Sequence, residues 1–261
     1  MPARDLERAR EAFAHRDAEG SRLAHDARAE ERHRAASGRY LKSIVYGGLD
    51  GIITTFAVVA GVAGAALSSG IVLILGFANL IADGLSMAIG DYLSTKAEND
   101  YAKAEREREE WEVEHYPDGE KKELVEVYVE KGLPEADARA VVDLIARYKR
   151  AWIDVMMVEE LGIVGAGESP LGNALATFVS FGAFGFVPLT PYVISLLAGA
   201  SGSRVFPVAS ALTALTLFAL GALKVWVTGR NWLRSGAEAL LVGGIAAAAA
   251  FAVGRLLSGL A

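Results

Sequence analysis

The sequence predicts an all-α membrane protein with five transmembrane spans and a three-helix cytoplasmic domain inserted between spans two and three. Three observations lead to this fold class. The mean hydropathy is +0.30 although 22% of the 261 residues are charged, so apolar and charged residues must be segregated along the chain. Five stretches are apolar and long enough to cross a bilayer core of about 30 Å as helices. The charged residues gather instead at the N-terminus and between residues 96 and 160.

The spans divide the chain into four regions. We place the spans at residues 43–66, 70–92, 171–198, 206–228 and 236–258. The regions are a charged N-terminal segment (1–40), spans one and two (41–95), the charged insert (96–165) and spans three to five (166–261). The third span contains Phe186-Val-Pro-Leu-Thr-Pro191, and we expect a kink or a break there because proline disrupts helix hydrogen bonding.

The N-terminal segment is charged and lacks the apolar core of a signal peptide, so the first span must act as its own insertion signal. It holds three of the four histidines, His15, His25 and His33. We interpret it as a charged leader in preference to a metal-gathering segment.

Lysine and arginine residues near the span ends predict the orientation. Arg39 and Lys42 precede span one, Lys96 follows span two, and three basic residues lie near the facing ends of spans four and five: Lys224, Arg230 and Arg234. Because loops rich in lysine and arginine stay in the cytoplasm, we expect the N-terminus and the charged insert there and the C-terminus on the opposite side. The high content of alanine, glycine and arginine favours a bacterial cytoplasmic membrane.

The charged insert is predicted to contain three helices. No helix breaker lies between Tyr92 and Glu114, so span two should continue as one helix beyond the membrane. Pro117-Asp-Gly119 marks a break, a second helix runs to about Lys131, and Gly132-Leu-Pro134 opens a third helix that ends near Gly162. The apolar residues expected to form a small core are Leu124, Val125, Val127, Tyr128, Val141, Val142, Leu144, Ile145 and Tyr148.

Polar side chains follow one face of each of the first two spans at intervals of four residues. They are Lys42, Tyr46, Asp50 and Thr54 in span one, and Asn79, Asp83, Met87 and Asp91 in span two. A charge near the centre of a bilayer costs about 2.5–3.5 kcal/mol or more, and such residues normally face a bundle interior or a water pathway. The alternative is that Asp50 and Asp91 lie near the cytoplasmic boundary and only reach headgroups. That alternative does not explain Asp83 and Met87.

The insert carries a second group of candidate metal ligands. Glu109 and Glu112 share one face of the first helix with Glu105. Glu120 and Glu123 lie at the start of the second helix, and Met156, Met157 and Glu160 lie at the end of the third. Apart from Met1, the chain has only three methionines, and all lie beside carboxylates. Thioether and carboxylate together form a mixed soft and hard ligand set, which suits a borderline transition metal better than calcium or magnesium.

The alternative for the insert is an ordinary solvated helix face. Charged faces are common on exposed helices, and Arg106 and Arg108 can pair with Glu109 and Glu112. The methionines favour a metal site, because the end of a soluble helix gains little from two exposed thioethers.

Three elements, YGGLDGIITTFAVVAGVAGA, ADGLSMAIGDYLSTKAE and MMVEELG, in this order and spacing, resemble the vacuolar iron transporter family, whose members exchange cytosolic ferrous iron for protons. The resemblance runs from about residue 38 to the C-terminus. It implies a five-span homodimer, a pathway lined by spans one and two of both subunits, and a three-helix cytoplasmic metal-binding domain.

By position, Asp50 and Met87 match the transport-site aspartate and methionine of that family. The residues that match its metal-gathering set are Glu109, Glu112, Glu120, Glu123, Met156, Met157 and Glu160. Some members carry a glutamate at the position of Asn79, which leaves Asp83 as a substitute.

We therefore expect a transporter, not an enzyme, that moves ferrous iron out of the cytosol in exchange for protons. Mn²⁺, Co²⁺ and Zn²⁺ suit the same ligands. Asp50 would serve as ligand when ionised and as proton carrier when protonated. The expected partners are the lipid bilayer, metal ions, protons and a second copy of the chain. The net charge of -6 argues against nucleic-acid binding.

Two alternatives belong to other functional classes. One is a membrane-anchored metal sensor or buffer, in which the spans serve only as an anchor. The other is a ferritin-like di-iron oxidase, because the chain contains Glu30-Glu-Arg-His33 and Glu112-Val-Glu-His115. Residues 1–40 lack the apolar stripe that would bury such a four-helix site.

Overall fold

The computed structural model describes residues 11–13, 15–24, 40–164, 167–199, 204–223 and 231–260. The chain divides into two compact units, residues 1–42 and 43–261. In the first unit α2 (Ala18–Ala24) is a short polar helix in which Arg22 pairs with Glu19. The predictions that concern His25, His33, Arg39, Lys224 and Arg230 lie outside the described residues.

The described part of the chain contains only helices and their connections, which confirms the all-α prediction. Five segments are long and apolar enough to cross a membrane: Leu41–Gly64, Ser69–His115, Pro170–Leu197, Val205–Ala222 and Trp232–Leu257. The predicted number of spans is therefore confirmed. The fourth span corresponds to α11 (Val205–Leu223) and the fifth to α13 (Trp232–Leu257), and the short helix η2 (Ser258–Leu260) follows.

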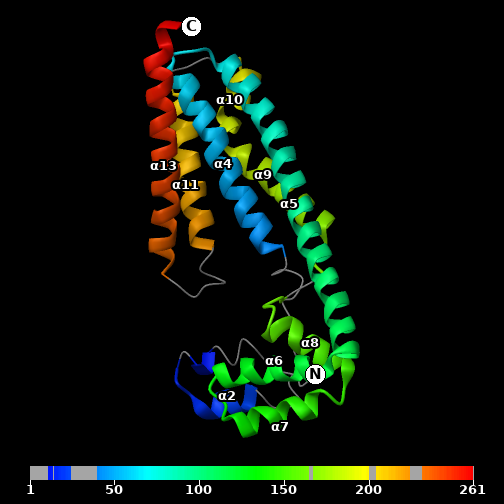
Figure 1. Cartoon of the computed structure of the whole chain (residues 1–261). Coiled ribbons are helices and arrows are strands. Elements are labelled where there is room, and N and C mark those ends of the chain that lie inside the picture. Colours follow the sequence, from blue (N-terminus) through cyan, green and yellow to red (C-terminus); the bar gives the residue numbers. More distant parts are fainter. Residues whose placement is uncertain are drawn as a thin grey trace. The chain divides into compact units, whose positions relative to one another are not determined.

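The first span is α4 (Leu41–Gly64), and α5 (Ser69–His115) is one continuous helix of 47 residues (Figure 1). At 1.5 Å per residue a helix of this length measures about 70 Å, so a bilayer core of about 30 Å can contain less than half of it. The apolar N-terminal half is the membrane span. The charged half, from Lys96 onward, lies beyond it, as the lack of a helix breaker predicts.

The third span is interrupted. It consists of α9 (Pro170–Gly185), the short 3₁₀ helix η1 (Val187–Leu189) and α10 (Thr190–Leu197). Pro188 and Pro191 lie in the first turns of η1 and α10, where a missing backbone N–H costs least. This confirms the break predicted from the two prolines.

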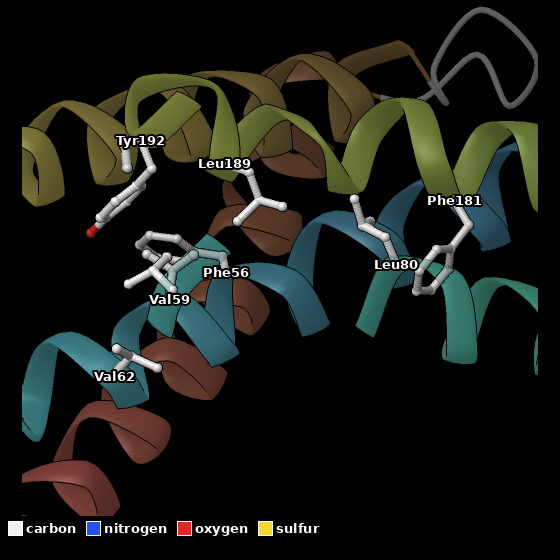
Figure 2. Close-up of a cluster of buried hydrophobic side chains, with 9 residues drawn as sticks. Phe56, Val59, Val62, Leu80, Phe181, Leu189 and Tyr192 are labelled. Atoms are coloured by element: carbon white, nitrogen blue, oxygen red, sulfur yellow. The ribbon is translucent and has the colours of Figure 1, made fainter. Parts of the chain in front are cut away.

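Glycine allows α4 to approach α9 closely. A Cβ atom added to Gly51 would lie 2.4 Å from the backbone oxygen of Phe181, and one added to Gly47 would lie 2.6 Å from that of Thr177. Next to this contact, buried side chains of α4, α5 and the interrupted third span form the membrane core, including Phe56, Leu80, Phe181, Leu189 and Tyr192 (Figure 2). The polar side chains of α4 and α5 are thus held on a rigid frame.

The charged insert continues from α5 into α6 (Pro117–Glu130), α7 (Glu135–Ile145) and α8 (Lys149–Glu159). The prediction of one third helix is wrong, because the chain turns between Ala146 and Tyr148 and forms two helices. No proline or glycine marks this turn. It lets Trp152 and Ile153 pack on the core side of the insert.

The core of the insert differs in part from the predicted one. Leu124, Val125 and Val142 are buried, whereas Leu144 and Tyr148 are exposed. The other core residues come from the C-terminal half of α5, from α7 and from α8: Val113, Ala138, Trp152, Ile153, Met156 and Met157. The unexpected turn before α8 explains this difference.

Candidate metal sites

Glutamates from three elements meet in the insert. One group joins Glu109 and Glu112 of α5 with Glu120 of α6, and a second joins Glu120 and Glu123 with Glu160 at the C-cap of α8. In each group the candidate ligand oxygens lie within 4.8 Å of one another. Glu120 belongs to both groups. We call these five residues the carboxylate cluster.

The local fold explains how the cluster forms. α5 ends at His115 and α6 begins at Pro117, so the chain changes direction at a single residue, Tyr116. The last turns of α5 therefore lie beside the first turn of α6, which carries Glu120. Spacing along the sequence alone predicts that Glu109 and Glu112 share one face of α5, and the turn at Tyr116 brings Glu120 of α6 to them.

Two members of the cluster are almost completely buried. Glu109 is 1% exposed and Glu120 is 4% exposed. One carboxylate oxygen of each, and one of Glu160, is buried without any hydrogen-bond partner in the described structure. Burial of an ionised carboxylate without a partner is costly, so these oxygens require either a proton or a cation.

Burial and mutual repulsion change the acidity of the cluster. Burial, and then the charges of Glu109 and Glu123, raise the pKa of Glu120 to about 7. The same causes raise the pKa of Glu160 to about 7. Burial also raises the pKa of Glu109, although the adjacent guanidinium of Arg108 opposes that change. The cluster therefore exchanges protons near neutral pH, where a divalent cation would compete with them.

The alternative interpretation, an ordinary solvated helix face, assumes that Arg106 and Arg108 of α5 pair with Glu109 and Glu112. The two arginines have different partners. Arg108 contacts Glu105, Glu109 and Glu112, at N–O distances of 2.8, 3.3 and 3.7 Å. Arg106 instead pairs with Asp154 of α8 at 2.5 Å. Pairing with one arginine thus occurs, but it leaves the buried oxygens of the cluster unpartnered.

The argument from exposed methionines is wrong. Met156 is 0% exposed and Met157 is 5% exposed, and both belong to the apolar core of the insert. Packing is therefore sufficient to explain two methionines at this point of α8. Their role as sulfur ligands stays a prediction.

The membrane half places Asp50 on α4, where it is partly buried. The Thr54 hydroxyl donates to the backbone oxygen of Asp50 at 2.9 Å, and the Asn79 amide of α5 lies 3.4 Å from the hydroxyls of Thr54 and Thr55. Asp83 is close enough for its charge to interact with that of Asp50. The polar faces of the first two spans thus meet at this level.

Met87 is partly buried against the membrane core shown in Figure 2. One helical turn later, the polar face of α5 no longer points to α4, since Asp91 accepts a hydrogen bond from Thr177 of α9. Positions four residues apart rotate by about 40° around a helix, so a stripe of that spacing drifts from one neighbour to the next. The predicted stripe is therefore shared between two partner helices.

Sequence reasoning missed the polar residues at the start of α9. Asn173 is 4% exposed, and its amide nitrogen donates to Thr95 of α5 and to Glu168, at 3.1 and 2.8 Å. Asn173, Thr177 and Ser180 follow one another at i, i+4 and i+7 in an otherwise apolar span. That spacing places the three side chains on one helix face, the same kind of signal that identified the polar faces of the first two spans.

The glutamate-histidine motif at the end of α5 does not form a joint site. Glu112 belongs to the carboxylate cluster, but His115 stacks on the ring of Trp111 and its Nδ1 lies 2.8 Å from the backbone oxygen of Trp111. The matching motif at Glu30-Glu-Arg-His33 lies outside the described residues.

Residues 41–255 match the model of the VIT family. The chain belongs to this family. A vacuolar iron transporter of Toxoplasma gondii is 42% identical over 268 residues, which cover 97% of this chain and 89% of the relative. A vacuolar iron transporter of Plasmodium falciparum is 37% identical, covering 83% of this chain and 82% of the relative. Vacuolar iron transporter 1 of Arabidopsis thaliana is 35% identical, covering 87% and 89%.

Membership in the VIT family confirms the resemblance and a multi-pass membrane protein. The relatives are named as transporters, in agreement with the expectation that the chain is not an enzyme. The prediction of a bacterial cytoplasmic membrane is wrong, because these relatives are vacuolar proteins of apicomplexan parasites and plants. A bilayer selects spans by length and apolarity, so the content of alanine and arginine does not identify the membrane.

Proposed function

We propose that this chain moves ferrous iron out of the cytosol in exchange for protons. The observation that carries the proposal is the carboxylate cluster, in which buried oxygens of Glu109, Glu120 and Glu160 have no partner. The names of the relatives support iron as the transported metal. Other divalent metals with similar ligand preferences, Mn²⁺, Co²⁺ and Zn²⁺, are further candidate substrates.

The two polar regions would have different tasks. The carboxylate cluster, together with the sulfur atoms of Met156 and Met157, would gather metal from the cytosol. Asp50 and Met87 would bind the ion within the membrane. Basic residues at the ends of the spans, such as Lys42 and Lys96, support a cytosolic position of the insert.

Proton exchange would follow from the chemistry of Asp50. An ionised carboxylate attracts a divalent cation, and a protonated one releases it, so metal and proton compete for the same oxygens. Asn79 cannot ionise and serves as a neutral partner, which leaves Asp83 as the second acid at this level.

A homodimer would complete the pathway. α4 carries Asp50, and the apolar half of α5 carries Asp83 and Asp91, so a two-fold axis beside these helices would line the pathway on both sides. α5 also exposes large apolar side chains, among them Ile74, Ile81 and Ile89. Because the chain has no cysteine, Ile81→Cys or Ile89→Cys can be crosslinked selectively, with Leu241→Cys on α13 as an exposed control. Crosslinks from α13 alone would contradict an α5 interface.

Reconstituted liposomes provide the direct test of transport. Protein is inserted into vesicles that contain a pH-sensitive dye, ferrous iron is added outside under a reductant, and metal uptake and internal pH are followed together. The proposal predicts iron entry with a simultaneous rise of internal pH, as protons leave. Iron entry without any proton movement would reject the exchange, and absence of entry would favour a membrane-anchored sensor.

A further inference from the structure

Arg108 is a permanent cation in contact with the carboxylate cluster. Its terminal nitrogen lies 2.8 Å from Glu105 and 3.3 Å from Glu109, and its Nε lies 3.7 Å from Glu112. The Arg108 side chain is 49% exposed, whereas Glu109 beside it is 1% exposed. A guanidinium keeps its charge at every accessible pH, so this contact does not depend on protonation.

The three carboxylates in contact with Arg108 are not equivalent. Glu109 and Glu112 belong to the cluster, but Glu105 belongs to neither of its two groups. Arg108 uses Oε1 of Glu109 and leaves Oε2 buried without a partner. It therefore occupies an oxygen that a bound metal could use, while its shortest contact is with a carboxylate outside the cluster.

We propose that Arg108 is a resident counter-ion that competes with the metal for the carboxylate cluster and moves toward Glu105 when a metal binds. The inference rests on the proposed metal-gathering function of the cluster. Two positive groups that share carboxylates repel each other, and partial burial strengthens the repulsion because water screens it less. Arg108 thereby lowers the affinity for divalent cations and speeds their release.

Fast release is what a loading site in a transporter requires. A cluster of five carboxylates without an internal cation would retain a divalent ion, and an ion that stays bound cannot continue to the membrane pathway. Arg108 keeps the empty cluster partly neutralised, and the half-exposed position of its side chain leaves room for it to move.

Arg106 provides a matched control on the same helix. It is two residues away, which places it on a different face of α5, and it pairs with Asp154 at 2.5 Å. Asp154 belongs to neither carboxylate group. Arg106→Gln therefore removes the same charge from the same helix without releasing a carboxylate of the cluster.

The test measures Co²⁺ binding to the full-length protein in detergent. The equilibrium affinity is measured for wild type, Arg108→Gln, Arg108→Lys and Arg106→Gln, and the dissociation rate is measured after addition of excess chelator. We expect Arg108→Gln to bind Co²⁺ about tenfold more tightly and to release it correspondingly more slowly. Arg108→Lys keeps the charge and should remain near wild type, and Arg106→Gln should change the affinity less than about twofold.

Two results would overturn the inference: unchanged or weaker binding by Arg108→Gln, or equal tightening by Arg106→Gln. If Arg108→Gln does not fold, Arg108→Met is the second neutral replacement, and the same tighter binding and slower release of Co²⁺ are expected of it. Failure of the wild-type protein to bind Co²⁺ is a different result, which would reject the cluster as a metal site.

Discussion

The membrane half and the charged insert of this VIT-family chain place carboxylates in different surroundings. In the membrane half, the Thr54 hydroxyl donates to the backbone oxygen of Asp50, the Asn79 amide donates to the Thr54 hydroxyl, and Asp83 is the one acid of the described residues whose charge acts on Asp50. In the insert five glutamates lie together with a single arginine. Few ligands allow an ion to pass, whereas many ligands collect it from dilute solution. The difference supports the proposal that the membrane half carries the ion and the insert gathers it.

The largest effect is expected from Asp50→Asn. Asparagine keeps the size and one acceptor oxygen but cannot ionise, so it loses the attraction for the cation and the exchangeable proton. We expect iron uptake and proton movement in liposomes to fall by at least about 100-fold, with the protein still folded. Size-exclusion chromatography checks the fold.

Asp91→Asn is the matched control for that change. Asp91 is also a carboxylate near the membrane, but it accepts a hydrogen bond from Thr177, which the amide oxygen of asparagine can still accept. Iron uptake and proton movement by the Asp91→Asn protein should stay within a few-fold of the wild-type values. If Asp91→Asn were as inactive as Asp50→Asn, the special role of Asp50 would be lost.

The next effect concerns metal binding by the insert. Glu109→Gln combined with Glu112→Gln removes two cluster ligands while keeping their size, and we expect Co²⁺ affinity to fall by about 10- to 100-fold. Met157→Ala is a poor choice for this test, because it opens a cavity in the core. The control is Glu107→Gln with Glu110→Gln, two exposed glutamates of the same helix. An equal loss of Co²⁺ affinity in both double variants would mean that the overall negative charge of the insert, and not specific ligands, determines binding.

Met87→Leu should have a smaller effect that depends on the metal. It removes the thioether but keeps an apolar side chain of similar volume against the membrane core, so folding should be preserved. Transport of softer ions should fall by several-fold more than transport of Mn²⁺, because thioether sulfur prefers softer metals. Uptake of each metal in liposomes, measured in parallel, checks this. Equal loss for all metals would argue against a sulfur ligand at this position.

The smallest effect is on stability. Because the pKa values of Glu120 and Glu160 are raised from 4.5 to about 7, the folded metal-free protein retains protons that the unfolded chain has lost. The free energy of unfolding should therefore decrease as pH rises from about 4.5 to 7. The fluorescence of tryptophan, including the buried Trp152, reports thermal unfolding in detergent.

This pH profile has an internal control. Glu120→Gln with Glu160→Gln removes both titrating groups and should flatten the profile, while Co²⁺ added to wild type at pH 8 should restore stability. A wild-type protein that becomes more stable from pH 5 to pH 8 without metal would contradict the raised pKa values.

The sequence allowed prediction of the spans, the long second helix and the break at Pro188 and Pro191, because length, apolarity and proline act locally. It also named the glutamates that the structure brings together. It did not predict the turn before α8, which no helix breaker marks and which depends on packing of Trp152. Burial of the two methionines of α8 depends on the same tertiary packing.

The central claim, that the insert gathers metal and the membrane half carries it, is tested most directly by the dependence of uptake rate on iron concentration. Initial rates in liposomes are measured for wild type, the Glu109→Gln and Glu112→Gln double variant, and Asp50→Asn, with the insert facing the added metal. We predict that the double variant is slow at low iron but approaches the wild-type maximum at high iron, whereas Asp50→Asn is inactive at every concentration. A double variant that remains inactive at saturating iron would contradict the division of tasks and make the cluster part of the pathway.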